Sequence, residues 1–330
     1  MFYEYALIPD IFDPTLLYCD GRADIIVTEI LRGVVLNGMI GDLHRGRLRE
    51  HVGELVGKIP EADPKTKQTS PRKQILDCLE LIKDRNRFVR HPLRPEGIPA
   101  TPREWLDLAL KSHATIRFDG LVTCPDCYDA ANLSTVPATA KLDDALNAQF
   151  WVSRRTDCPL KSKRVSEFQR ALVPVLRHAK KVTLIDPYIE PDKPRWINTV
   201  RLVQELIGRR VAGDAGYQAT VHIHAGDPEP RTASGQLNLW ENALKALPIR
   251  FKTSVSLWSM KLDRANFPDG PEMHDRYIIT NQVGVSCPGG LDCYADPDKS
   301  PKAKATSTWS LIGWDAMSDH LAEFDENAGM

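Results

Sequence analysis

The sequence predicts an α/β protein built from two domains. The chain has 330 residues, of which 42% are apolar and 26% charged, and a chain of this length can bury two separate cores. In the second half, short β-branched runs alternate with amphipathic helical segments, a pattern typical of a sheet covered by helices. Helical periodicity dominates the first half. We therefore expect a mostly helical α+β domain over residues 1–130, a linker over 131–160 and an α/β domain over 161–330.

The first domain shows several separate helical patterns and one strand. The expected elements are a buried helix at Ile25–Leu36, a helix beginning at Leu48, a helix through Ile75, Leu79 and Ile82, a short helix opened by Thr101 and Pro102, a strand at Ala114–Val122, and an interdomain connection at Asp129–Leu146. Proline is favourable in the first turn of a helix, because the amide it lacks would have no partner there.

A basic cluster, Arg85, Arg87, Arg90 and His91, follows the third helix of this domain. One interpretation is a face that binds an anion. The other is that the cations are attracted to the negative end of a helix dipole, which requires no ligand. The sequence leaves both interpretations open.

The second domain shows strands and helices in alternation. The expected elements are a strand at Lys181–Ile185 closed by Asp186-Pro187-Tyr188, a helix from Trp196 to a stop at Gly208, a strand at Ala219–Ala225, a helix from Leu237 to Leu247, a strand at Ile249–Leu257 and a strand at Tyr277–Thr280. In the strand at Ala219–Ala225, Val221 and Ile223 share one face, and His222 and His224 share the other.

The segment from Met273 to Asp292 indicates a phosphate site. His274 and Arg276 are two positions apart on an expected strand, so their side chains lie on one side and can contact the same anion. Asn281 offers a further polar group near the strand end. The Gly289-Gly290 turn allows a close backbone approach, and its amides are candidate donors to a phosphate.

This segment resembles the phospholipase D superfamily motif, His-x-Lys-x4-Asp followed by Gly-(Gly/Ser)-x-Asn. His274 matches the histidine, Arg276 stands in place of the lysine, Asn281 replaces the aspartate and Asp292 falls near the last asparagine. The residues of the motif are most similar to those of the phospholipase-D-like C-terminal domain of MIT-domain proteins, which is associated with lipid-headgroup binding. The order of strands and helices also fits one phospholipase-D-like repeat, a mixed sheet with flanking helices.

The resemblance implies roles for individual residues. His274 would be the nucleophile, Arg276 the phosphate clamp and Asn281 a positioning group. It also brings Asp186 and Tyr188 into the pocket, although Asp-Pro-Tyr is equally well explained as a turn followed by a half-buried ring. Asp275 or Asp292 could supply the negative charge that Asn281 lacks. His222 and His224 could be pocket groups or metal ligands, and a solvated sheet face is the simpler explanation.

Phospholipase-D-type chemistry uses two histidines, one forming a phosphohistidine and one protonating the leaving oxygen. The sequence contains no second copy of the motif, so we expect a homodimer that completes the site, with no metal or other cofactor. We expect nucleic acid as the substrate. Residues 161–210 carry 12 Lys/Arg against 5 Asp/Glu and could line a groove for phosphate backbones, although a solvated basic helix face is at least as common an explanation. Bacterial single-motif members are often nucleases of defence systems, and partner proteins are then expected. The alternative is an inactive module that binds phosphate, nucleic acid or a lipid headgroup in an assembly.

The remaining composition indicates a cytoplasmic protein. The chain has a net charge of −1, and no apolar run approaches the length of a membrane span or of a secretory signal. Seven cysteines, an odd and scattered set, favour a reducing compartment. Cys124 and Cys127 form a Cys-x-x-Cys pair without a second pair to complete a zinc site. We therefore expect two free thiols in a turn, unless Cys158 together with Cys287 or Cys293 supplies the two missing ligands through the fold.

Overall fold

The computed structural model describes residues 2–19, 22–61, 71–91, 93, 97–136, 138–152, 156–210, 217–227, 233–247, 250–259 and 276–319. The chain divides into two compact units, Phe2–Arg155 and Thr156–Met330. Each unit is built around its own sheet, so the α/β class is confirmed.

A five-stranded, entirely parallel sheet forms the centre of the first unit. Its order is β3 (Phe88–Arg90), β2 (Gly38–Asp42), β1 (Tyr3–Leu7), β4 (Gly120–Thr123) and β5 (Thr139–Lys141). The chain first builds outward from β1 through β2 and β3, and then returns to the other side of β1 for β4 and β5. The strand order therefore reverses between β1 and β4.

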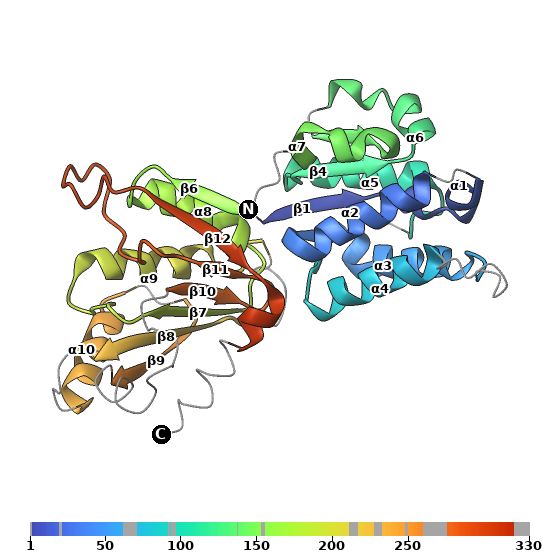
Figure 1. Cartoon of the computed structure of the whole chain (residues 1–330). Helices are drawn as coiled ribbons and strands as arrows, with labels where there is room; N and C mark the ends of the chain where they lie inside the picture. Colours follow the sequence, from blue (N-terminus) through green and yellow to red (C-terminus); the bar gives the residue numbers. More distant parts are fainter. Residues whose placement is uncertain are drawn as a thin grey trace. The chain divides into compact units, whose positions relative to one another are not determined.

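Helices connect these strands and bury their apolar faces in the core of the unit (Figure 1). They are α1 (Pro14–Cys19), α2 (Ala23–Asn37), α3 (Leu43–Gly57), α4 (Pro71–Asp84), α5 (Pro102–Thr115), α6 (Pro125–Ala130) and α7 (Gln149–Val152), with short 3₁₀ turns η1 (Pro9–Phe12), η2 (Leu133–Thr135) and η3 (Leu142–Asn147). The expected helices all lie close to these bounds. The expectation of a mostly helical α+β domain was wrong, because it missed the parallel sheet. The strand expected at Ala114–Val122 is shorter and starts only at Gly120, since α5 continues to Thr115.

The basic cluster after α4 is structural. Arg87 is buried, and its Nη1 donates to the carbonyls of Val34 at 3.1 Å and Val35 at 2.5 Å, near the end of α2. Arg85 Nη1 also donates to the Val35 carbonyl, at 2.8 Å. The cations thus satisfy the last carbonyls of a helix, as the dipole interpretation requires, but the helix is α2 rather than α4. The anion-binding interpretation was wrong for these two residues.

The second unit contains a seven-stranded mixed sheet. Its order is β6 (Asp157–Leu160), β12 (Ser307–Ile312), β11 (Gly284–Ser286), β10 (Tyr277–Thr280), β7 (Lys181–Asp186), β8 (Thr220–Asp227) and β9 (Lys252–Ser259). Strands β7, β8 and β9 are parallel, and each pair from β7 through β10, β11 and β12 to β6 is antiparallel. Strands β7 to β10 lie where the sequence predicts them. Strands β6, β11 and β12 were not foreseen.

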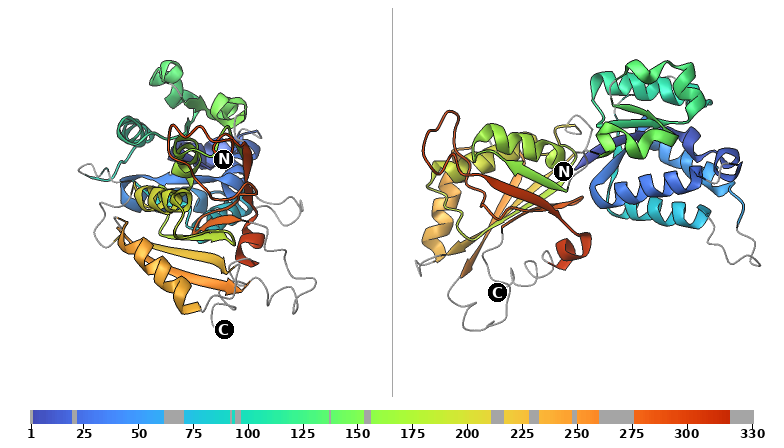
Figure 2. Two further views of the ribbon diagram at one scale, coloured as in Figure 1. Left: turned by 90° about the vertical axis from the view of Figure 1, so that its left-hand side faces the viewer. Right: turned by 45° about the horizontal axis from the view of Figure 1, so that its top comes forward.

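Three longer helices accompany this sheet: α8 (Val165–Leu176), α9 (Pro194–Leu206) and α10 (Ala233–Lys245). Helices α8 and α9 lie beside each other over one face of the sheet (Figures 1 and 2). On the other face, Ile185, Tyr277, Ile279 and Met317 form a small apolar cluster. Alternation along β7 places Asp186 on the opposite face from Ile185, the face shared with Val182 and Leu184.

Residues 131–160 are not a simple linker. They supply η2, β5, η3 and α7 to the first unit and β6 to the second. Within the described residues, every helix is too short or too polar to cross a membrane.

Candidate functional site

Asp186 organises the carboxyl end of β7. Its side chain is fully buried, and burial raises the pKa of the carboxyl above its ordinary value despite the hydrogen bonds that lower it. Oδ1 accepts from the amide of Tyr188 at 2.9 Å, and Oδ2 accepts from the amide of Leu291 at 3.0 Å. One carboxylate therefore holds together the turn after β7 and the glycine turn 105 residues later in the chain.

Arg276 lies beside this carboxylate because of the sheet register. Tyr277 pairs with Ile185 in the antiparallel β10–β7 ladder, which brings the preceding Arg276 next to Asp186. Arg276 Nε is 3.6 Å from Asp186 Oδ1, and Arg276 Nη1 donates to the carbonyl of Pro288 at 3.0 Å. The guanidinium carbon is 4.9 Å from the centre of the Tyr188 ring. These contacts fix the guanidinium, and 21% of the side chain stays exposed to solvent.

The glycine turn closes over Arg276. Gly290 has a φ of +89°, a conformation that favours glycine, and its amide donates to the carbonyl of Cys287 at 2.8 Å. A Cβ on Gly290 would lie 3.1 Å from Asp292 Oδ1 and 3.5 Å from Arg276 Nε, so these groups surround one small space. Because the Gly290 amide is engaged within the turn, it cannot donate to a phosphate as the sequence suggested.

Lys163 completes the cluster. Its Nζ is 2.5 Å from Asp292 Oδ1, and both side chains are mostly buried. Lys163 lies just before α8, 129 residues from Asp292, and sequence reasoning did not identify it. The only available signal was its place in the basic stretch of residues 161–210. We call Lys163, Asp186, Tyr188, Arg276 and Asp292 the β7-end cluster.

Asn281 does not belong to the β7-end cluster. It follows β10 at the opposite end of the ladder, five residues or about 17 Å of extended chain from Arg276. Its Oδ1 accepts from the amides of Lys180 at 2.8 Å and Lys181 at 3.2 Å, at the start of β7. Its predicted role as a positioning group for a phosphate on Arg276 was wrong, because strand direction separates the two side chains.

His222 and His224 are also separate from the β7-end cluster. They pair in register with Thr183 and Ile185 of β7, so they occupy the face of the sheet opposite Asp186. His222 ring nitrogens are 2.5 Å and 3.1 Å from the hydroxyls of Ser254 and Ser256 on β9. Among the described residues, neither histidine is part of a group of three ligands close enough to hold a metal ion. Their expected place in the pocket of Arg276 was wrong.

His274 and Asp275 lie outside the described residues.

Comparison with protein-family models and with curated proteins found no match for this chain.

Proposed function

We propose that the second unit is a phospholipase-D-like phosphodiesterase that acts on nucleic acid. The observation that carries the proposal is the position of Arg276, fixed between Asp186, Tyr188 and the glycine turn at the carboxyl end of a sheet strand. It stands two residues after His274. A guanidinium in this position offers charge-assisted hydrogen bonds to a phosphate oxygen.

In the proposed reaction, a nitrogen of His274 attacks phosphorus. A P–N bond forms as the bond from phosphorus to the leaving oxygen breaks, and the corresponding histidine of a second chain donates a proton to that oxygen. Water then hydrolyses the phosphohistidine, and the second histidine takes up its proton. Arg276 stabilises the negative charge on the phosphoryl oxygens, and we assign the Gly289 amide to them as a backbone donor.

Nucleic acid is the proposed substrate because of the local charge. Residues 161–210 carry 12 Lys/Arg against 5 Asp/Glu. The stretch spans α8, β7 and α9 and includes Asp186 of the β7-end cluster. Clustered cations bind polyphosphate backbones mainly through counterion release, whatever the base sequence. We propose that the chain works as a homodimer, alone or with partner proteins of a defence system.

The second candidate is a module that binds a phosphate without cleaving it. Two observations favour it. Both cations of the β7-end cluster face carboxylates, and Asn281 lies too far from Arg276 to orient a histidine there. This module would bind a phosphorylated partner or headgroup within an assembly. The two candidates share Arg276 and differ in the role of His274.

Cleavage of single- and double-stranded DNA and RNA in EDTA tests the proposal, because phosphohistidine chemistry requires no metal. We expect the unchanged chain to nick at least one of these substrates. His274→Ala should reduce cleavage by at least about 100-fold, the scale of losing a covalent catalyst, without reducing binding. His222→Ala, on the other face of the sheet, is the matched control and should cleave normally. A His274→Ala protein with full activity would exclude this mechanism.

A further inference from the structure

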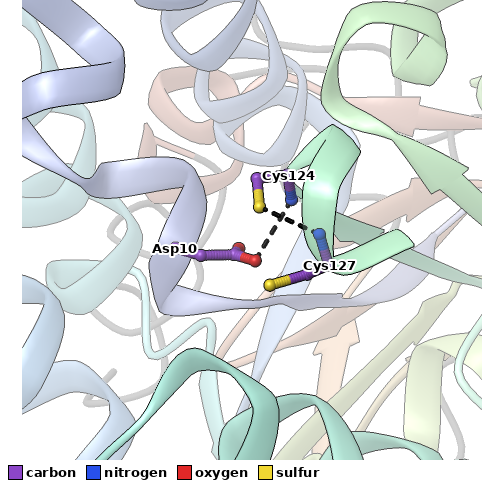
Figure 3. Close-up of side chains that lie close together, drawn as sticks. All are labelled: Asp10, Cys124 and Cys127. Atoms are coloured by element: carbon purple, nitrogen blue, oxygen red, sulfur yellow. Dashed lines mark hydrogen bonds between the residues drawn. The ribbon is translucent and has the colours of Figure 1, made fainter. Parts of the chain in front are cut away.

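Three residues far apart in the sequence come together in the first unit. Asp10 lies in η1 after β1, Cys124 directly follows β4, and Cys127 lies in α6 (Figure 3). One ligand atom of each lies within 4.8 Å of the others, and in the described ranges no other three His, Cys, Asp or Glu residues come as close. The expectation of an isolated Cys-x-x-Cys turn overlooked the third group, because 114 residues separate Asp10 from Cys124.

Asp10 is a buried carboxylate with one oxygen available to bind a ligand. Its side chain points toward the two cysteines, and the residue is only 6% exposed (Figure 3). Oδ2 accepts from the hydroxyl of Thr123 at 2.6 Å and from the amide of Cys124 at 3.2 Å. Oδ1 is buried and accepts no hydrogen bond from a nitrogen or oxygen donor of the described residues, and the two cysteine thiols lie beside the carboxylate. Among the described residues, no cationic side chain pairs with Asp10. Buried charges in proteins are normally paired or coordinate a metal.

The position of this group in the fold also points to a ligand. Asp10 and Cys124 follow the carboxyl ends of β1 and β4, the adjacent parallel strands between which the strand order reverses. Ligands of open parallel sheets bind outside the carboxyl ends of the strands at such a reversal. Both cysteines are half-buried rather than enclosed, so the group can be reached from solvent.

We propose that Asp10, Cys124 and Cys127 bind one divalent transition-metal ion of the zinc class. Two thiolates and one carboxylate suit zinc, whereas magnesium and calcium prefer oxygen ligands throughout. Tetrahedral zinc places its sulfur ligands about 3.8 Å apart, which the observed spacing reaches with a small shift of side chains. Three protein ligands leave the fourth position for water or a bound molecule.

The surroundings of the ligands fit this assignment. The Thr123 hydroxyl and the Cys124 amide fix the orientation of the Asp10 carboxylate, as hydrogen-bonding groups around metal ligands do. The amide of Cys127 donates to the Cys124 sulfur at 3.4 Å, a bond that stabilises charge on that sulfur. These residues are separate from the β7-end cluster, so the proposal does not depend on phosphodiester cleavage.

The test is metal binding by the full-length chain kept under reductant. After chelation and removal of the chelator, zinc is titrated in competition with a chromophoric chelator, and cobalt is used for its thiolate charge-transfer absorption. We expect one zinc per chain and a cobalt spectrum of two thiolates. Cys127→Ser and Asp10→Asn should each weaken zinc binding by about 100-fold or more, since each loses a ligand. Circular dichroism checks that both variants fold.

Matched controls are Cys78→Ser, which removes a buried thiol of α4, and Asp126→Asn, which removes an exposed carboxylate between the two cysteines. Both should bind zinc like the unchanged chain. The proposal is overturned if the unchanged chain takes up less than one zinc, or if folded Cys127→Ser binds zinc equally well. It is also overturned if the chain binds no zinc and Cys124 and Cys127 form a disulfide on mild oxidation. That result would identify a redox pair. Cleavage in EDTA by His274 is scored separately and is independent of each result.

Discussion

Arg276 stands where the motif that this segment resembles has a lysine, and its contacts show how an arginine fits this position. Its guanidinium donates to the Pro288 carbonyl, lies over the Tyr188 ring and approaches the Asp186 carboxylate. A lysine ammonium is a single point charge and could not make all three contacts in a fixed plane. The arginine in place of the expected lysine is therefore integrated into the local structure, and contact with a phosphate oxygen is the role that we propose for it.

Removing this guanidinium should weaken substrate binding and cleavage together. For Arg276→Ala we expect a loss of about 1.5–3 kcal/mol in both, because a bound phosphate loses a charge-assisted partner. The measurements are the Kd of a non-cleavable oligonucleotide and the cleavage rate. Lys302→Ala, an exposed cation outside the basic stretch of residues 161–210, is the control and should change neither by more than a few-fold. If Arg276→Ala abolishes activity in cells while His274→Ala does not, the binding module replaces the phosphodiesterase.

Gly290 should resist substitution for two reasons. Its φ of +89° strains any other residue by about 1–3 kcal/mol, and a Cβ would press on Asp292 Oδ1 at 3.1 Å. Gly290→Ala should therefore lower the urea-unfolding free energy of the second unit by that amount and also weaken oligonucleotide binding. Gly313→Ala is the control, since nothing lies within 4 Å of its Cβ position. Equal stability of the two variants would refute the strain argument.

At the scale of elements, the sequence reveals strands that are long or that alternate. Strands β7 and β8 have six and eight residues and each contains β-branched residues in alternation, and both lie where predicted. Strand β2, Gly38–Asp42, contains two glycines and is buried at every position, so neither composition nor alternation marks it. Strand β3 has only three residues. Short, fully buried parallel strands are recognisable only through their partners, which explains why the first unit was taken as mostly helical.

Helix α5 begins with a complete capping box, which the Thr101-Pro102 pair partly predicted. The Thr101 hydroxyl accepts from the Glu104 amide at 3.3 Å, and the Glu104 carboxylate accepts from the amides of Ala100 and Thr101 at 2.6 Å and 3.1 Å. Thr101→Ala should lower the unfolding free energy of the first unit by about 0.5–2 kcal/mol, measured by urea denaturation.

The Glu104 half of this box should depend on pH. The hydrogen bonds from Ala100 and Thr101 hold the pKa of Glu104 below its ordinary value of 4.5. A carboxyl whose pKa is lowered on folding stabilises the protein above its unfolded pKa, and this contribution is lost as the pH falls through the folded pKa. Glu104→Ala should therefore be destabilising at pH 7 and become less so as the pH falls below 4.5, measured by urea denaturation at pH 7 and pH 3. Lys111→Ala, exposed on the same helix, should show no such change; an equal Glu104→Ala effect at both pH values would contradict this explanation.

At the scale of the whole molecule, both side-chain groups depend on contacts between distant segments. Lys163 meets Asp292 across 129 residues, Leu291 meets Asp186 across 105, and Cys124 meets Asp10 across 114. Periodicity and spacing carry no information about such pairs. The resemblance to a known motif gathered Asp186, Tyr188, Arg276 and Asp292 in one site, but it could not supply Lys163. It also placed Asn281 there. A motif gives the spacing of residues along the chain, but it does not show that Arg276 and Asn281 lie at opposite ends of the same strand.

One histidine motif per chain makes association part of the proposed mechanism. If His274 of each chain contributes to one shared site at an interface of second units, a dimer with one His274→Ala chain has lost one of its two catalytic histidines. Mixing unchanged and His274→Ala chains in equal amounts, with denaturation and refolding to exchange them, then leaves only about a quarter of the dimers intact. Cleavage should fall to about a quarter of the rate of the unchanged protein. A mixture with about half the rate would show that each chain acts alone, and sedimentation of the active protein as a monomer would exclude the shared site. Mixing with His222→Ala chains is the control and should leave the rate unchanged.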